Sequence, residues 1–515
     1  MIRITKTENG MVRGIPAADT FITAFKGIPF AAPPVGENRW RIPQPAENWE
    51  GVRDCFRFGP IAMQDVPNGD AFYDKEWHND PARDDMASFS EDCLQLNIWT
   101  PAKTVDDRLP VMVWIYGGGL NWGHPSEMEF DGERMARRGV VLVSVNYRLN
   151  AFGFLAHPEL TAETGGKGCT NFGLFDQKAG IEWVRRNIAN FGGDPENLTV
   201  FGQSAGGRST LCQIVTPYNV GTPIRQAISQ SGGGISFGTG AGANGYPTLA
   251  EAEKAGEAFF ELLGVKTLEE ARRIDAVTLR KKASEFRNSG AYRWGLVVDG
   301  DFLPDQPNRL LCENKRLQIP VMIGNTDDEF MDVFPAKDYA SFEQMVSARL
   351  GEDADEFLRL CGKGEKSEQE IMAAAKVNGS AFGARLFCMR AKEAGLPAYF
   401  YSFGPEIPGE DHPGAFHSSE LWFMFETLAK CWRPFVGKHY DLARLMCNYW
   451  TNFAKTGDPN GPDADGTPMP EWKVFAGSDP RGITFRETAK MDDKDLTEPI
   501  EFLYNAAAKK LWGNV

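Results

Sequence analysis

Long apolar runs recur through the middle of the chain. The runs 110–116 (PVMVWIY) and 139–147 (GVVLVSVNY) are almost continuously apolar and rich in β-branched residues. This pattern is typical of strands that are buried on both faces of a parallel sheet. Shorter runs predict further strands at 197–202, 226–231, 317–324 and 398–403.

Helical patterns occupy the stretches between these strands. Segment 175–193 carries apolar residues at helical spacing and ends near Gly192, a typical stop signal. Further helices are predicted at 205–215 and 442–457, and the charged blocks around 249–290 and 340–395 are also helix-prone. The alternation predicts an α/β protein with a mostly parallel central sheet flanked by helices. No flexible linker interrupts it, so we expect one domain over residues 1–515, with the two charged blocks as helical insertions.

Composition narrows the possible functions. The chain of 515 residues is 42% hydrophobic and carries a net charge of −15, which argues against binding to nucleic acid. No apolar run is long enough for a signal peptide or a membrane span. The nine cysteines form no Cys-x-x-Cys pair, so neither a zinc site nor a disulfide framework is indicated. We expect a reduced cytoplasmic protein that needs no cofactor or metal and has no membrane partner.

Two segments match Gly-x-Ser-x-Gly, a pattern that places a nucleophilic serine on a sharp turn between a strand and a helix. Ser204, in FGQSAGG (201–207), has a predicted strand before it and a predicted helix after it. Ser236, in GISFG (234–238), is followed by TGAGANGYP, which cannot begin a helix at once. We therefore predict that Ser204 is a nucleophile and that Ser236 lies in a loop.

A nucleophilic serine needs a base, and in this type of site the acid and the histidine follow the serine along the chain. Among six histidines, three lie far enough along. His412 precedes a proline in a turn-like segment and should be exposed, whereas His439 stands at a possible helix start as a solvated or partly buried residue. His417 lies between a predicted strand and an apolar helix, so its position favours it as the base.

The acid and the oxyanion donors are less sharply defined. Asp327, Asp328 and Glu329 all follow the strand predicted at 317–324, and their spacing does not choose among them. The oxyanion that forms on attack needs backbone N–H donors. Ala205, directly after the serine, and the triple glycine 117–119, directly after the strand at 110–116, can supply them.

Seven stretches of the chain, in the same order, resemble sequence blocks of the type-B carboxylesterase family. This family includes bacterial para-nitrobenzyl esterases, cholinesterases and some fungal lipases, and the resemblance runs nearly end to end. The stretches are FKGIPFAAPPVGENRW (25–40), EDCLQLNIWTP (91–101), VWIYGGG (113–119), NYRLNAFGFL (146–155), FGGDPENLTVFGQSAGG (191–207), VVDGDFLP (297–304) and FAKTGDPNG (453–461).

The resemblance implies an α/β-hydrolase fold, with helical insertions that cover the active site, and a serine esterase. Carried over by position, it assigns the nucleophile to Ser204, the acid to Glu329 and the base to His417. The oxyanion hole would consist of Gly118, Gly119 and Ala205. The implied reaction is two-step ester hydrolysis through an acyl-enzyme.

The chain departs from the family pattern at several positions. Gln203 stands where a glutamate is usual, Phe330 replaces a common glycine, and Leu120 stands where an aromatic residue is usual. In secreted relatives the cysteine matching Cys93 bonds to an upstream cysteine. Here that upstream position is Ala62, although Cys55 is near enough in sequence to offer another partner.

The leading hypothesis is a serine carboxylesterase for small, mostly neutral esters, acting as a monomer or small homo-oligomer. Leu120, Gln203 and four aromatic residues near the catalytic positions could line its pocket; the aromatic residues are Trp122, Phe330, Phe416 and Trp422. Two alternatives remain open: a noncatalytic, cholinesterase-like binding module, and a hydrolase for amides or carbamates.

Overall fold

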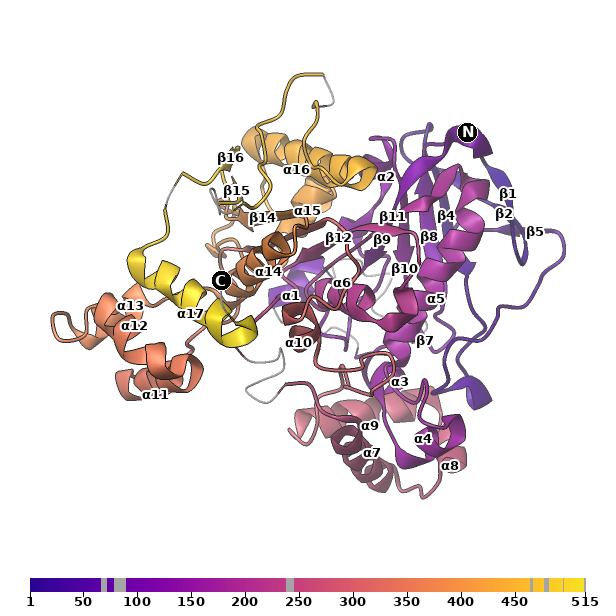
Figure 1. Cartoon of the computed structure of the whole chain (residues 1–515). Helices are drawn as coiled ribbons and strands as arrows, with labels where there is room; N and C mark the ends of the chain where they lie inside the picture. The colour runs from indigo at the N-terminus through magenta and orange to yellow at the C-terminus, as the bar shows by residue number, and fades with distance from the viewer. Residues whose placement is uncertain are drawn as a thin grey trace.

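One large sheet runs through the whole molecule (Figure 1). The computed structural model describes residues 1–65, 72–77, 89–237, 245–463, 466–476, 481–493 and 495–513. The strands of the central sheet are β3 (Ile15–Pro16), β4 (Thr23–Pro29), β8 (Gln95–Thr100), β9 (Leu109–Ile115), β10 (Val141–Val145), β11 (Gly193–Gln203), β12 (Ile224–Gln230), β13 (Val321–Thr326), β14 (Ala398–Phe403), β15 (Ile483–Phe485) and β16 (Ala489–Met491).

The strand order is β16-β15-β14-β13-β12-β11-β9-β10-β8-β4-β3. The central part, from β15 to β10, is parallel, whereas β16, β8, β4 and β3 pair antiparallel to their neighbours. The carboxyl ends of the parallel strands therefore meet at one edge, where ligand sites of such sheets form. Two small sheets lie outside it and contain β1 (Ile4–Thr7), β2 (Gly10–Arg13), β5 (Val52–Asp54), β6 (Ile61–Ala62) and β7 (Phe89–Ser90).

Helices cover both faces of the sheet. In Figure 1, α2 (Glu133–Ala136) and α16 (Gly437–Thr456) lie above it, and α6 (Ala205–Val215) and α10 (Pro307–Cys312) lie below it. The other helices that flank the sheet or its edges are α1 (Phe72–Trp77), α3 (Asn150–Phe154), α4 (Pro158–Thr164), α5 (Phe172–Asn187), α14 (Gly379–Glu393), α15 (Glu420–Met424) and α17 (Glu498–Trp512). This confirms the predicted α/β class.

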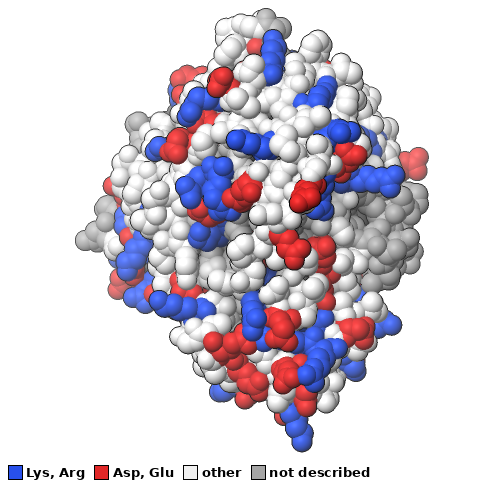
Figure 2. Space-filling model, turned by 90° about the vertical axis from the view of Figure 1, so that its right-hand side faces the viewer, with Lys and Arg blue, Asp and Glu red and all other residues white. Residues whose placement is uncertain are grey.

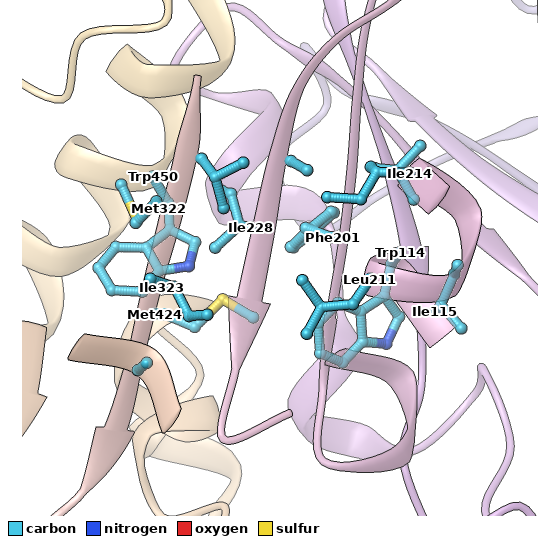
Figure 3. Packing of buried hydrophobic residues seen from close by; sticks show 14 of the residues in the cluster. Trp114, Ile115, Phe201, Leu211, Ile214, Ile228, Met322, Ile323, Met424 and Trp450 are labelled. Atoms are coloured by element: carbon cyan, nitrogen blue, oxygen red, sulfur yellow. The ribbon is translucent and has the colours of Figure 1, made fainter. Parts of the chain in front are cut away.

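The core fills the space between the sheet and these helices (Figure 3). Trp114 of β9 packs against Phe201 of β11, with ring centroids 4.9 Å apart. Leu211 of α6 and Trp450 of α16 approach the sheet from its two faces and are both fully buried. Trp422, a candidate pocket residue, lies in the same core and is 1% exposed.

Most predicted strands match observed ones. The strand expected at 398–403 is β14 with the same bounds, and the helix expected at 205–215 is α6 with the same bounds. The strand predicted at 317–324 starts too early, because β13 begins only at Val321. Pro320 precedes it and has no N–H for the sheet, so the strand starts after the proline.

The two charged blocks are helical. The first contains α7 (Leu249–Leu263), α8 (Leu268–Arg272) and α9 (Ala276–Asn288). The second contains α11 (Tyr339–Leu350), α12 (Ala354–Cys361), α13 (Glu368–Ala374) and α14. In Figure 1 the first group lies at the bottom of the molecule, and α11 to α13 lie at the left beside α17.

The distribution of charge, the state of the cysteines and the length of the helices bear on the predictions made from composition. On the face seen in Figure 2, acidic and basic side chains are intermixed. All nine cysteines lie in the described residues and are free, so Cys55 and Cys93 form no bridge. Burial raises the pKa of the Cys55 thiol to about 11. In the described part of the chain, no helix has the length and apolar character needed to cross a bilayer.

Candidate active site

Ser204 lies on a strained turn between β11 and α6. Its backbone has φ 56° and ψ −122°, a region that L-residues rarely occupy and that costs about 1–3 kcal/mol. Two hydrogen bonds fix the turn: the Ser204 N–H donates to Gln230 O at 2.8 Å, and the Arg208 N–H donates to Ser204 O at 2.9 Å. Ser236 has no such setting and lies in irregular structure, as predicted.

The glycines of the motif make this turn possible. A methyl group on Gly202 would lie 2.5 Å from the carbonyl oxygen of Ile115, and one on Gly206 would overlap that same oxygen. Only hydrogen side chains let α6 begin this close to β9 and β11. The turn therefore lifts Ser204 to the carboxyl edge of the sheet, with the positive end of the α6 dipole beneath it.

The triple glycine lies directly against the serine. A methyl group on Gly117 would lie 3.0 Å from Cβ of Ser204. Gly118 and Gly119 have φ values of 95° and 62°, and among the described residues their N–H groups have no acceptor. Ala205 opens α6, so its N–H has no intrahelical acceptor either. The segments that meet at Ser204 thus carry three backbone N–H groups that have no acceptor in the described part of the backbone.

His417 and Glu329 form a close pair beside this turn. Nδ1 of His417 lies 2.5 Å from Oε2 of Glu329, and the two side chains are only 9% and 3% exposed. The Thr326 hydroxyl, at the end of β13, donates to the other carboxylate oxygen at 3.2 Å. With Nδ1 donating to Glu329, Nε2 of His417 is left as the proton acceptor.

The neighbouring acids and the other candidate histidines are engaged elsewhere. Asp327 binds Arg486, and Asp328 accepts a hydrogen bond from the Ala415 N–H at 2.8 Å. His412 is exposed as expected. His439 is buried in the first turn of α16, where its Nδ1 accepts from the Val436 N–H at 3.0 Å. Of the three candidate acids, only Glu329 contacts His417.

Gln203 occupies the acceptor side of the histidine. Its Nε2 lies 3.4 Å from Nε2 of His417, and its side chain is buried. Among the described residues, Ser204 Oγ makes no direct hydrogen bond to His417. The histidine is therefore held by Gln203 and Glu329. Such contacts commonly rearrange when substrate binds.

Comparisons with known proteins identify the family of the chain. The carboxylesterase family model matches residues 2–503. This chain belongs to the carboxylesterase family. It is 33% identical to the fumonisin B1 esterase of Sphingopyxis macrogoltabida over 477 residues, which cover 89% of this chain and 82% of the relative. It is 32% identical to the para-nitrobenzyl esterase of Bacillus subtilis over 475 residues, which cover 89% and 91% of the two chains.

Solved structures of the family share the fold. A para-nitrobenzyl esterase structure superposes with a TM-score of 0.77 at 28% identity and covers 98% of this chain and 99% of its own. A carboxylesterase of Geobacillus stearothermophilus gives a TM-score of 0.73 at 29% identity, with 97% and 99% covered. The fold is thus that of the α/β-hydrolases, and the protein is a carboxylic ester hydrolase.

Replacing Gln203 by glutamate tests the contact with His417. A carboxylate at this position would stabilise the imidazolium of His417. As the pH falls, His417 would therefore become protonated, and unable to accept a proton, at a higher pH than in wild type. In this carboxylesterase we expect Gln203→Glu to move the acidic limb of the kcat/KM profile to higher pH by about 1 unit. The exposed variant Gln318→Glu adds the same charge far from the site and should leave the limb in place. An unmoved limb in Gln203→Glu would contradict the contact.

Three of the candidate pocket residues lie in the segments around Ser204 and His417 and differ in exposure. Phe330 is 67% exposed, and its ring centroid lies 4.5 Å from that of His417. Trp122 is 46% exposed and runs along Gly118 and Gly119. Leu120 is only 6% exposed. Tyr73 was not expected at the site, and no sequence motif marks it; its hydroxyl donates to His417 O at 3.3 Å.

A buried arginine connects α1 to the loop that carries His417. The Arg433 guanidinium donates to Glu76 of α1 at 2.5 Å and to Asp411 at 3.0 Å, and the side chains of Arg433 and Glu76 are both 1% exposed. Phe416 lies under the guanidinium, 5.5 Å from its carbon, and meets Phe72 of α1 edge to face at 4.9 Å. This ion pair fixes an aromatic wall beside the base.

Glu420 is a buried acid without an ion-pair partner among the described residues, and it lies near Glu329. It lies in the first turn of α15, it is fully buried, and in the described part of the chain neither carboxylate oxygen has a hydrogen-bond partner. Burial, reinforced by the charge of Glu329, raises its pKa to about 8. It is therefore neutral at pH 7. The only sequence signal for it is a single acid in the apolar run ELWFMF (420–425).

The raised pKa of Glu420 predicts a pH-dependent stability. Below about pH 4.5 the folded and unfolded states both keep the proton, so burial costs nothing in ionisation. Between pH 4.5 and 8 only the unfolded state loses it, and stability falls by roughly 1.4 kcal/mol per pH unit. We expect Glu420→Gln to gain in thermal midpoint over wild type as pH rises from 5 to 8. Glu406→Gln, at an exposed side chain, should show a constant difference; a constant difference for Glu420→Gln would contradict the assignment.

Proposed function

We propose that this carboxylesterase hydrolyses carboxylic esters through an acyl-enzyme on Ser204. His417 acts as general base and then general acid, and Glu329 holds its ring and stabilises the imidazolium. Gly118, Gly119 and Ala205 donate to the oxyanion. The observation that carries the proposal is the 2.5 Å contact between His417 Nδ1 and Glu329 Oε2 beside a serine with positive φ.

The chemistry follows from these positions. Ser204 Oγ attacks the ester carbon while its proton passes to Nε2 of His417, and the carbonyl electrons become an oxyanion. The oxyanion then re-forms the carbonyl, the ester C–O bond breaks, and Nε2 returns the proton to the departing alcohol. Water repeats the sequence on the acyl-enzyme and releases the carboxylic acid. Gln203 must move away from Nε2 before the first transfer, because the single lone pair of Nε2 cannot accept the Gln203 hydrogen bond and the Ser204 proton at once.

We also propose small, mostly neutral esters as substrates, with Phe330, Phe416 and Trp122 as apolar lining and with neutral Gln203 giving no attraction for cationic alcohols. The exposure of Phe330 and Trp122 beside His417 and Gly119 supports this choice.

A single domain is supported by the one sheet that extends from β3 to β16. Nine free cysteines support a reducing, cytoplasmic location.

Aryl esters of increasing acyl length test the activity. We expect a burst of nitrophenol from 4-nitrophenyl esters, equal to the enzyme concentration, followed by steady turnover with kcat common to different alcohols when deacylation limits. The acyl length at which kcat/KM falls measures the acyl site. Absence of any turnover would favour the noncatalytic binding module. Faster cleavage of matched anilides than of esters would favour the amide hydrolase.

A further inference from the structure

Two arginines lie near Ser204 and have no partner among the described residues. Arg208 follows Ser204 by one turn of α6, and a methyl group on Gly233 would overlap its Nη2. Arg293 is exposed, and a methyl group on Gly119 would lie 3.2 Å from its Nη2. Neither guanidinium has a hydrogen bond or ion pair with any described residue. Both positive charges are therefore available to a ligand.

The nearby arginines of α9 behave differently. Arg280 and Arg287 both bind Asp65, at 3.0 and 2.9 Å, and Arg287 also lies 5.6 Å from the ring of Trp122. Here the chain supplies its own carboxylate for the cations. In the described part of the chain it supplies none for Arg208 and Arg293, although unpaired guanidiniums next to a partly buried site usually bind carboxylate or phosphate.

The two arginines face a common region next to Ser204. Gly119 lies in the loop after β9, and Gly233 lies in the loop after β12, and these strands flank β11 on its two sides. An acyl group on Ser204 must pass between the two loops, since ligands bind outside the carboxyl ends of the strands. Burial raises the pKa of the Tyr246 phenol and both guanidiniums oppose the rise, so both lie near that side chain.

This region is on the acyl side of the site. His417 must return its proton to the departing alcohol, so the alcohol lies beside His417, Phe330 and Tyr73. The arginines contact Gly119 and Gly233 instead, next to the oxyanion donors. Neutral Gln203 places no negative charge between them and the ester.

We propose that Arg208 and Arg293 bind a carboxylate carried by the acyl group, so that half-esters of dicarboxylic or polycarboxylic acids are preferred substrates. This rests on the proposed ester hydrolysis at Ser204 and refines its substrates: the alcohol stays small and neutral, and the acyl group carries the negative charge. The products are the free alcohol and the corresponding dicarboxylate or polycarboxylate.

Matched esters measure the preference. Hydrolysis of monoethyl glutarate and diethyl glutarate is followed by acid release at constant pH. We expect wild type to have the higher kcat/KM for the half-ester. Arg208→Gln and Arg293→Gln should each lose about 10- to 100-fold on the half-ester and less than about twofold on the diester. Arg185→Gln, at an exposed arginine of α5 paired with Glu182, should change neither, and Arg208→Lys should recover part of the loss.

The outcomes separate the two proposals. If wild type hydrolyses neither ester nor aryl esters, the proposed function fails. If it hydrolyses the diester but the arginine variants lose both activities equally, or neither, the carboxylate site fails while ester hydrolysis stands. The carboxylate site can also be tested in the wild type alone, by product inhibition. Glutarate should inhibit diester hydrolysis at least about tenfold more strongly than pentanoate. Equal inhibition would contradict the carboxylate site.

Discussion

Ser204→Ala is expected to lower kcat for 4-nitrophenyl esters by about 10⁶-fold while the protein stays folded. The nucleophile is lost, but the oxyanion donors and the pocket remain, so some substrate binding should persist. Alanine and serine both carry a Cβ, so the backbone strain at φ 56° is the same for both. We therefore expect little change in the thermal midpoint. Steady-state kinetics with highly purified protein measure the loss.

Ser236→Ala is the matched control, because it removes the other serine found in a Gly-x-Ser-x-Gly match. Ser236 lies in irregular structure, so its loss should change kcat by less than about twofold. A large loss in Ser236→Ala with little loss in Ser204→Ala would reverse the assignment of the nucleophile. A loss in both, with lowered thermal midpoints, would indicate damage to the fold instead.

Glu329→Gln is expected to lower kcat by about 10⁴-fold with little change in KM. The amide can still reach His417 but cannot stabilise the imidazolium that forms on proton transfer, and it can hold the ring in the wrong tautomer. The residual rate should rise with pH where hydroxide can replace the base. A pH profile of kcat measures both effects.

Asp327→Asn is the control for this change, since it alters an adjacent carboxylate that binds Arg486 rather than the histidine. We expect it to keep kcat within about twofold of wild type. Equal losses in the Glu329 and Asp327 variants would mean that the acid is not selected by its contact with His417.

Much of the sheet could be predicted because its central strands are buried on both faces. β10 and β14 read as short apolar runs, and no other element of that length and composition fits them. The antiparallel strands were harder to predict. β4 contains Lys26 and Gly27, and its register against β8 shifts between Phe25 and Ile28, so its pattern of apolar residues is interrupted.

The residues flanking Ser204 and His417 were enough to propose them as nucleophile and base, but the acid could not be chosen from the residues alone. Asp327, Asp328 and Glu329 are consecutive, and the turn after β13 sends each side chain to a different partner. That direction depends on tertiary contacts with the loop before His417, which spacing does not encode. Family resemblance selected Glu329, and the observed contact with His417 is consistent with that choice.

Contacts between residues that are distant in sequence could not be predicted. Arg433 and Glu76 are 357 residues apart in the chain, and nothing in either segment marks an ion pair. That Arg208 and Arg293 have no partner among the residues that the structure describes is likewise visible only in the folded molecule, because arginine is common on surfaces and usually pairs with a carboxylate. Such long-range pairing decides which charges a substrate meets.

The central claim is that one activated serine, at position 204, attacks the substrate. Incubation with diethyl 4-nitrophenyl phosphate, followed by proteolysis and mass analysis of the peptides, tests it most directly. The account predicts one diethylphosphoryl group per chain, located on Ser204, with activity lost in proportion to labelling and no labelling of Ser204→Ala. Labelling at another residue, or full inactivation without a phosphoryl group on Ser204, would contradict it.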